Sequence, residues 1–359
     1  MMALLSAAVP RIAALAGGRD EQAAFPEEEV ALLREAGVLA APLPAMGGGD
    51  CAALRLAAVL ATVGRASLPL GRILEAHVNA RHLIACYGTA AQRSAAADDA
   101  AAGHLFALWV TDPPENALRV HREGTALRLE GGKMFCSAAG YATRALVTAQ
   151  TADGAVRMLV LMLRCGECVS PLAAPLAGMR AATTGAIDFS GCFADSTAVL
   201  GQPGDYLREP AFSTGAWRGS AVMYGGLCAV VEAMGEQLRA AGRLEDPHQA
   251  ARMGEAFIAR ETVRGWIGRM ARIAEDPAAD PAAAVAMVGL GRLAVEAACL
   301  DAMRLAQRSL GLAAFRHGNP IERVCRDLAT YLRQPAPDAV LTVAASWFAG
   351  QAPPAVVCA

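Results

Sequence analysis

Apolar residues recur at the spacing of a helix along the first part of the chain. Val30, Leu33 and Ala36 fall on one face of a segment that begins with an acidic turn. Further apolar segments follow, and the last of them ends at Gly88. The pattern predicts an N-terminal helical domain over residues 1–103.

The period of the pattern changes near Leu105. Residues 126–129 alternate between apolar and polar positions, which is the spacing of a half-buried strand. Two glycine-containing pairs, 131–132 and 153–154, are typical of hairpin turns, and the second is the strongest such signal in the chain. We expect an antiparallel, barrel-like β domain over residues 104–210.

Helical spacing returns after residue 210 and continues to the C-terminus. Residues 211–241 read as one long helix, two apolar stripes follow, and a fourth helix begins at Asn319, which can cap it beside Pro320. Short connections between long helices indicate an antiparallel bundle. The chain is therefore predicted to be α+β, with its C-terminal four-helix bundle over residues 211–359.

Composition narrows the possible partners. The 359 residues carry a formal net charge of −2 without basic blocks, which argues against nucleic acid or an anionic membrane surface as the main partner. No stretch is predicted to span a membrane, because residues 219–231 are too few and Pro353 and Pro354 interrupt the uncharged tail. The N-terminus lacks a basic region, so we expect a cytoplasmic protein.

Ten cysteines are scattered along the chain, and only Cys165 and Cys168 form a C-x-x-C pair. No second pair follows at the spacing of a zinc site. We therefore expect no metal, and reduced, buried thiols rather than a redox motif.

The stretch from Gly311 to Asp338 contains the most specific pattern. Its sequence P-I-E-R-V-C-R-D follows a Q-x-x-x-G turn, and the charged positions lie off the apolar stripe of the helix. On chemistry alone those charges describe a solvated helix face with weak ion pairs. The pattern, however, resembles the C-terminal signature of the acyl-CoA dehydrogenase family of flavoproteins. Segments near Phe25 and Tyr87 are similar to the N-terminal helical domain of that family.

The resemblance implies an FAD site shared between subunits. Gln307 and Gly311 match positions that approach the FAD of a neighbouring subunit, and we expect a homodimer or homotetramer built through the bundle. Arg243 is the remnant of a further segment that binds the partner's FAD in the family. An ordinary helix-end arginine is an equal alternative for Arg243.

Two motifs in the β domain resemble the family's flavin contacts. The run L-W-V-T-D-P, which includes Leu108, Val110 and Thr111, is similar to a strand end whose backbone and threonine contact the flavin ring. The run G-K-M-F-C-S is similar to one whose aromatic and hydroxyl face the ring, which here are Phe135 and Ser137. The alternative is that these are ordinary strand-end and core residues.

The departures from the family concern the catalytic base and the phosphate loop. Nine residues after Arg326, where the family often has its glutamate, this chain has Pro335, and the alternative position holds Trp217. Asp338 is the remaining candidate. Residues 114–119 replace a glycine-rich loop, so binding of a coenzyme A thioester is in doubt.

Three functions follow from these observations. The first is an FAD-dependent oxidoreductase that carries out α,β-dehydrogenation of an acyl thioester or a related small molecule. The second is a flavin-dependent monooxygenase or oxidase on the same fold, which needs no base for the substrate's α-proton. The third is a non-catalytic helical assembly protein that retains the fold. The first is the prediction that we carry forward.

Overall fold

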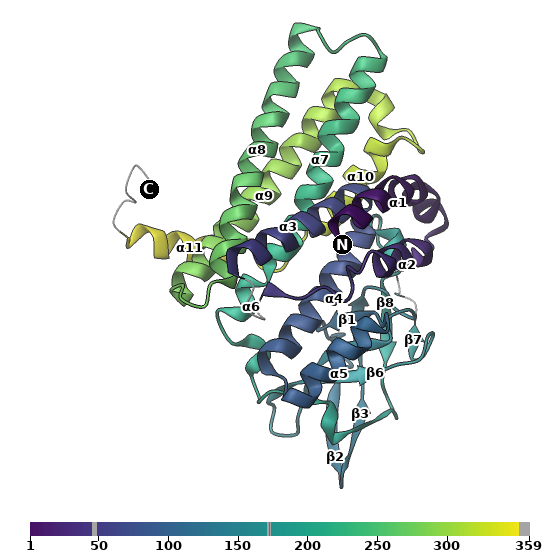
Figure 1. Cartoon of the computed structure of the whole chain (residues 1–359), viewed down its shortest axis with the longest axis vertical. Coiled ribbons are helices and arrows are strands. Elements are labelled where there is room, and N and C mark those ends of the chain that lie inside the picture. Colours follow the sequence, from purple (N-terminus) through teal and green to yellow (C-terminus); the bar gives the residue numbers. More distant parts are fainter. Residues whose placement is uncertain (45–48, 171, 173, 352–359) are drawn as a thin grey trace.

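The structure is a computed structural model that describes residues 1–44, 49–170, 172 and 174–351. It has three parts, with the N-terminal helices beside a β region and the long helices of the bundle extending away from both (Figure 1). The prediction of an α+β fold with these three parts is confirmed. Pro353 and Pro354, on which the expectation about the tail rested, lie outside the described residues.

The N-terminal part consists of five helices whose ends follow local signals. Ser67 caps one of them by accepting a hydrogen bond from the Leu70 amide at 3.4 Å. Thr89 and Gln92 form a reciprocal capping box at the next. The helices are α1 (Met2–Gln22), α2 (Glu27–Glu35), α3 (Gly49–Ala66), α4 (Leu68–Tyr87) and α5 (Ala90–Ala101).

The middle part contains two sheets. The larger has the strand order β10-β6-β5-β2-β3-β9 with β1 added to β5, and the smaller has the order β4-β8-β7. The expectation of an antiparallel domain needs correction, because β5 pairs in parallel with both β1, where Phe106 lies opposite Arg144, and β2. The strands are β1 (Phe106–Trp109), β2 (Arg119–Glu123), β3 (Ala126–Glu130), β4 (Gly132–Cys136), β5 (Arg144–Gln150), β6 (Val156–Met162), β7 (Val169–Ser170), β8 (Gly185–Asp188), β9 (Phe193–Asp195) and β10 (Val199–Leu200).

Of the two predicted hairpins, one is confirmed and one is wrong. Strands β5 and β6 pair antiparallel around residues 153–154, with Thr148 opposite Met158. At residues 131–132 the chain instead passes from β3 in the larger sheet to β4 in the smaller one. Gly131 has a φ of 91°, and a side chain there would collide with the Ala117 carbonyl, so the glycine serves a close crossing.

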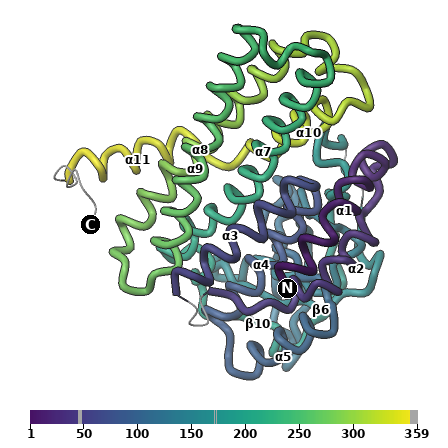
Figure 2. Tube along the Cα trace, turned by 45° about the horizontal axis from the view of Figure 1, so that its top comes forward, coloured from purple at the N-terminus to yellow at the C-terminus, as the bar shows by residue number. Residues whose placement is uncertain are grey.

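The C-terminal part is a bundle in which three long helices begin with the same signal. Asp246, Asp280 and Asn319 each accept a backbone amide hydrogen bond and are each followed by proline. The predicted helix over 211–241 is interrupted at Gly215. The helices are α6 (Ala211–Thr214), α7 (Ala216–Ala240), α8 (Pro247–Glu275), α9 (Pro281–Leu310), α10 (Pro320–Tyr331) and α11 (Pro337–Ala349). Helix α11, which the sequence patterns did not predict, projects from the base of the bundle (Figure 2).

Glycines allow the bundle to join the N-terminal helices at short range. A Cβ atom on Gly64 of α3 would overlap the Val222 backbone, and one on Gly225 of α7 would overlap the Ala61 carbonyl oxygen. The backbones of α3 and α7 therefore cross in direct contact. This crossing fixes the start of α7 against α3 and α4, where the functional residues described below lie.

Helix α9 is long and apolar enough to cross a membrane by length and composition, counted over residues 281–315 with a mean hydropathy of 1.7. In the structure α9 packs against α7, α8 and α11 as a helix of the bundle. Length and composition alone are weak evidence for a membrane span in such a helix.

Candidate functional site

The two β-domain motifs end side by side. The Met134 amide donates to the Thr111 carbonyl at 2.9 Å, and the indole N–H of Trp109 donates to the Ser137 carbonyl at 2.9 Å. The end of β1 and the strand β4 are thus joined by hydrogen bonds between residues far apart in the sequence. The structure therefore brings together the positions that the resemblance assigned to one flavin ring.

A buried lysine holds this junction in place. Lys133 is 1 % exposed, and its Nζ donates to Asp112 at 2.6 Å and to Thr148 at 2.9 Å. Burial lowers the pKa of Lys133, and the hydrogen bond that Lys133 donates to Asp112 opposes that shift. A longer contact of 3.4 Å reaches the Val110 carbonyl, so Val110 contributes backbone rather than side chain.

The side chains at this junction differ in exposure. Thr111 is exposed, Leu108 is half-buried, and Ser137 is buried. Phe135 is 47 % exposed on a left-handed backbone with φ 55°, although an aromatic residue gains most from burial. An exposed aromatic ring beside a free hydroxyl suits a planar, partly polar ligand, so the residues present fit a flavin.

The residues expected to contact a neighbour's cofactor lie elsewhere. Arg243, between α7 and α8, donates to the Ser309 carbonyl of α9 at 3.3 Å, and Gln307 and Gly311 lie at the same end of α9. We call Arg243, Gln307 and Gly311 the bundle tip. It lies at the end of the bundle remote from the β domain (Figure 1). One copy of the chain therefore does not bring the bundle tip to Thr111 and Phe135.

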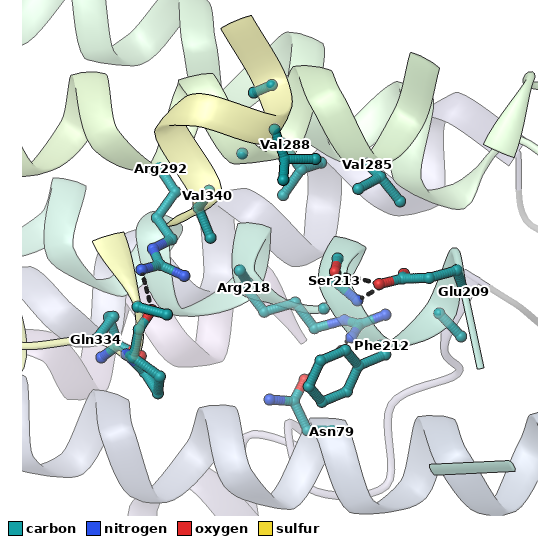
Figure 3. A pocket seen from close by; sticks show the side chains of 18 of the residues that line it. Asn79, Glu209, Phe212, Ser213, Arg218, Val285, Val288, Arg292, Gln334 and Val340 are labelled. Atoms are coloured by element: carbon teal, nitrogen blue, oxygen red, sulfur yellow. Dashed lines mark hydrogen bonds between the residues drawn. The ribbon is translucent and has the colours of Figure 1, made fainter. Parts of the chain in front are cut away.

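A cavity of about 580 Å³ opens where the β domain meets the base of the bundle (Figure 3). Leu108 of β1 reaches it, so it adjoins the strand end described above. Its walls are mainly apolar, with Leu83 of α4, Phe212 of α6, Val288 of α9 and Val340 of α11. Mostly apolar walls with a few polar groups are typical of small-molecule sites. The polar lining residues include Glu75, Asn79, His82, Arg218, Arg292 and Gln334.

Glu75 is the deepest carboxylate in the lining and is surrounded by donors. It is 7 % exposed, and it accepts hydrogen bonds from Arg72 and Asn79. The Tyr331 hydroxyl adds a third donor at 3.4 Å. The oxygens of this carboxylate are therefore already engaged by three donors of the same chain.

A second buried network surrounds Arg218. Its Nη2 donates to Glu275 at 2.6 Å and its Nη1 to Asn79 at 3.0 Å. The indole of Trp217 also donates to Glu275, at 3.0 Å. The side chains of Arg218 and Glu275 are only 5 % and 2 % exposed. Trp217, at the position where the family can carry a base, thus orients the partner of a buried arginine.

His82 is the one histidine in the cavity lining. It is largely buried, and burial holds the pKa of its imidazole well below the ordinary value, with nearby Arg218 acting in the same direction. The ring is therefore neutral. Its Nδ1 is buried without a hydrogen-bond partner in the described part of the chain. A neutral imidazole with a free nitrogen can hydrogen-bond a ligand without supplying charge.

The structure does not bring Asp338 to the cavity. The lining includes Pro335, Ala336 and Ala339, whereas Asp338 is exposed in the first turn of α11. The turn of the helix directs this carboxylate to solvent, and the expectation that it reaches inward is not supported. Both family positions for a base hold residues that cannot accept a proton here, Pro335 and Trp217.

The polar residues of α4 escaped the sequence patterns. Glu75, Asn79 and His82 lie four and three residues apart, so one face of α4 carries all three. The shared face of these three polar residues was a usable signal. The pairing of Arg218 with Glu275, 57 residues away, was not predictable from spacing.

The charged positions of α10 make buried contacts rather than a solvated face. Arg326 donates to Asp20 of α1 at 2.6 Å and to Glu322 at 2.8 Å. Asp327 is fully buried and accepts the Met179 amide at 2.5 Å, and burial raises its pKa to about 6. The interpretation as a solvated face is therefore wrong for Arg326 and Asp327, which tie α10 to α1 and to the β domain.

The expectation of buried thiols is met by Cys136, Cys299 and Cys325, whereas Cys51, Cys86 and Cys165 are exposed. The sulfur of Cys168 lies 3.3 Å from that of Cys192. Among the described residues, no group of three or more potential metal ligands is found.

Comparisons with known proteins agree with the fold. Residues 6–104 match the family model described as acyl-CoA dehydrogenase, N-terminal domain. A 154-residue stretch is 30 % identical to 3-sulfinopropanoyl-CoA desulfinase of Variovorax paradoxus. That stretch is 41 % of this chain and spans about two fifths (39 %) of the desulfinase.

Solved structures with the same fold cover nearly the whole chain. Glutaryl-coenzyme A dehydrogenase in complex with glutaryl-CoA superposes with a TM-score of 0.83 at 20 % identity, over 97 % of this chain and 95 % of that one. Methanesulfinate monooxygenase from Pseudomonas fluorescens gives 0.83 at 17 % identity, over 99 % and 98 %. KijD3 in complex with FMN gives 0.81 at 22 % identity, over 96 % and 92 %. At these identities the likeness describes the fold, which serves both dehydrogenases and oxygenases.

Proposed function

Since the chain is an acyl-CoA dehydrogenase-like protein, we propose that it is a flavin-dependent enzyme acting on a small molecule in the cavity beside β1. The bound flavin would supply the redox chemistry. Thr111 would hydrogen-bond the edge of its ring and Phe135 would cover a face, because these exposed groups meet at one strand end. Leu108 would separate the ring from the cavity that it also lines.

Reaction of the reduced flavin with oxygen fits the cavity better than α,β-dehydrogenation. The observation that carries this choice is that the two carboxylates among the described lining residues already accept hydrogen bonds from the chain itself. Glu75 is held by three donors, and Glu209 is exposed and accepts from Ser213. A missing general base typically costs 10²–10⁴-fold in rate, roughly, for a reaction that removes a proton from carbon.

The flavin would be held between two copies of the chain. The bundle tip lies far from Thr111 and Phe135 within one copy, so a second copy would have to bring its tip to the strand end. Gln307 and the backbone around Gly311 would then contact the flavin, and Arg243 would attract its phosphate. We propose a homodimer or larger even-numbered assembly on this ground. FAD is the expected flavin, although FMN fits the ring contacts equally well.

The test is purification followed by three measurements on one sample. A visible spectrum shows whether flavin is bound, and chromatography of the released cofactor distinguishes FAD from FMN. Oxygen uptake is then followed with a flavin reductase and NADH, and light scattering gives the assembly state. Bound flavin with reductase-dependent oxygen uptake supports the proposal. A chain that takes up neither flavin refutes it.

Dehydrogenation is the alternative, favoured by the stretch that matches a CoA-dependent desulfinase. It is separated by mixing the flavin-loaded protein with acyl-CoA esters of several lengths without oxygen. Bleaching of the flavin absorbance at tens per second would replace the oxygen-dependent proposal with the dehydrogenase. We expect no bleaching on that timescale.

A further inference from the structure

Arg292 of α9 places a positive charge in the wall of the cavity. Its side chain hangs from α9 beside Val340 of α11, and its guanidinium points into the space between the helices (Figure 3). The Nη2 atom donates to the Pro335 carbonyl at 2.6 Å. Pro335 occupies the position at which related proteins often carry their base, so this charge lies near the expected reaction centre.

The charge on Arg292 has no carboxylate partner in the described chain. Glu296, one turn further along α9, forms an ion pair with Arg333, in which Nη2 and Oε1 are 2.6 Å apart. No ion pair or hydrogen bond involving its Nη1 is found within the described residues, and its Nε is buried without a partner. Burial lowers the pKa of Arg292, and the nearby charge of Glu296 opposes that shift, so the guanidinium remains protonated at neutral pH.

The other charges of the cavity are compensated. Arg218 is paired with Glu275, and Glu75 is paired with Arg72. Glu209 is exposed at the end of the cavity opposite Arg292, where Ser213 donates to it (Figure 3). Arg292 is half-buried and has no ion-pair partner within the described residues, so an anionic ligand in the cavity could pair with its charge.

We propose that Arg292 binds an oxyanion carried by an otherwise apolar substrate. Carboxylate, sulfinate and phosphate share the chemistry required, which is a compact group of oxygens that accepts hydrogen bonds from a guanidinium. The anion accepts from Nη1, while the valines of α9 and α11 contact the apolar part. This inference rests on the proposed function, because it names the substrate class of the same cavity.

The test compares four probes with the same six-carbon body in calorimetric titrations of the flavin-loaded protein. Hexanoate, hexane-1-sulfinate and hexyl phosphate carry the three oxyanions, and hexanamide is the neutral control. We expect at least one oxyanion to bind roughly tenfold or more tightly than hexanamide. The relative affinities of the three oxyanions then show which headgroup the site prefers. Oxyanions that bind no more tightly than the amide would overturn the proposal.

Variants then locate the effect. Arg292→Gln should weaken oxyanion binding by on the order of 10- to 100-fold and leave hexanamide unchanged, and Arg292→Lys should keep part of the affinity. Arg304→Gln is the matched control, because Arg304 lies on the same helix, is exposed, and loses the same charge outside the cavity. Equal weakening by Arg304→Gln, or loss of the amide together with the oxyanions in Arg292→Gln, would contradict the assignment.

Failure of this inference can be told apart from failure of the proposed function. Flavin content and reductase-dependent oxygen uptake are recorded for every variant, and circular dichroism reports folding. If the purified chain takes up no flavin, the proposed function fails, while the probes can still be compared on that chain. If flavin and oxygen uptake are normal but all four probes bind alike, only the oxyanion site fails.

Discussion

The cavity and the bundle tip lie at opposite ends of the long helices and are built in contrasting ways. At the cavity, Arg72 and Arg218 are paired with carboxylates of the same chain. Helices α3, α4 and α7 meet there through glycines and buried hydrogen bonds. At the bundle tip, Arg243 and Gly311 are exposed and contact little beyond their own end. From this contrast we infer that the cavity is complete in one copy of the chain and that the bundle tip contacts a second copy.

The largest effect should come from breaking a buried ion pair at the cavity. Glu275→Gln leaves the Arg218 charge buried and uncompensated, and we expect a loss of about 3 kcal/mol or more in the free energy of unfolding. Glu245→Gln makes the same chemical change in the exposed loop at the tip and should stay within about 0.5 kcal/mol. Denaturant titrations give both values. Equal losses would remove the contrast between the two ends.

A glycine pair tests the same contrast through packing. Gly225→Ala forces a methyl group into the Ala61 carbonyl at the α3–α7 crossing, and overpacking there should cost roughly 1–3 kcal/mol. Gly254→Ala, in the part of α8 nearer the tip, meets nothing within 4 Å and should stabilise the protein by about 0.5–1 kcal/mol. Thermal unfolding of both variants would show opposite signs. A stabilised Gly225→Ala would mean that α3 and α7 do not cross in contact.

Acid should lower the stability of the protein through a buried histidine of α4. His77 of α4 contacts the Leu39 carbonyl through Nε2 at 2.9 Å and accepts the Phe106 amide through Nδ1 at 3.1 Å. Burial lowers its pKa from 6.5 to about 3, so below pH 6.5 the unfolded chain binds a proton that the folded chain does not. The free energy of unfolding should therefore decrease as the pH is lowered, and at pH 5 it should be about 2 kcal/mol smaller than at pH 7.

Unfolding titrations between pH 7 and pH 5 measure that slope. His77→Gln should flatten it, whereas His248→Gln, an exposed residue at the tip end of α8, should leave it unchanged. Buried Asp327 acts in the opposite direction, because its pKa is raised to about 6 and its contribution is lost as the pH rises through that value. A slope that is unaltered in His77→Gln would place the acid sensitivity elsewhere.

The smallest effect on stability, and the most specific one on function, should come from the tip. Arg243→Gln removes an exposed charge, so the free energy of unfolding should change by less than about 0.5 kcal/mol. If Arg243 contacts the partner's flavin, affinity for the flavin should fall roughly tenfold. Fluorescence titration of the chain with FAD measures it. Unchanged affinity would favour the interpretation of Arg243 as an ordinary helix-end residue.

The three-part architecture could be predicted because the apolar residues recur with a different period in the helical parts and in the β part. Asn319, which is followed by proline, placed the start of α10 correctly from local chemistry. The hairpin expected at residues 131–132 was wrong because a glycine pair also serves a crossing between sheets. Local spacing does not tell which strand becomes the neighbour.

The candidate site was only half visible in the sequence. Thr111 and Phe135 were found because their motifs are continuous, and the structure joins them. The cavity depends on residues brought together by tertiary packing, so the unpaired charge of Arg292 is evident only once Glu296 is seen to bind Arg333. The expectation for Asp338 failed because a one-residue step on α11 turns a side chain from the cavity to solvent.

Whether a second copy completes the flavin site is best tested by mixing two defective variants. One carries Thr111→Val and Phe135→Ala at the strand end, and the other carries Arg243→Gln and Gln307→Ala at the tip. Each alone should bind flavin poorly. Unfolding and refolding an equal mixture should restore tight binding at about a quarter of the sites, since half of randomly formed dimers are mixed and each mixed dimer has one intact site. Flavin binding in the mixture that does not exceed that of either variant alone would contradict the claim.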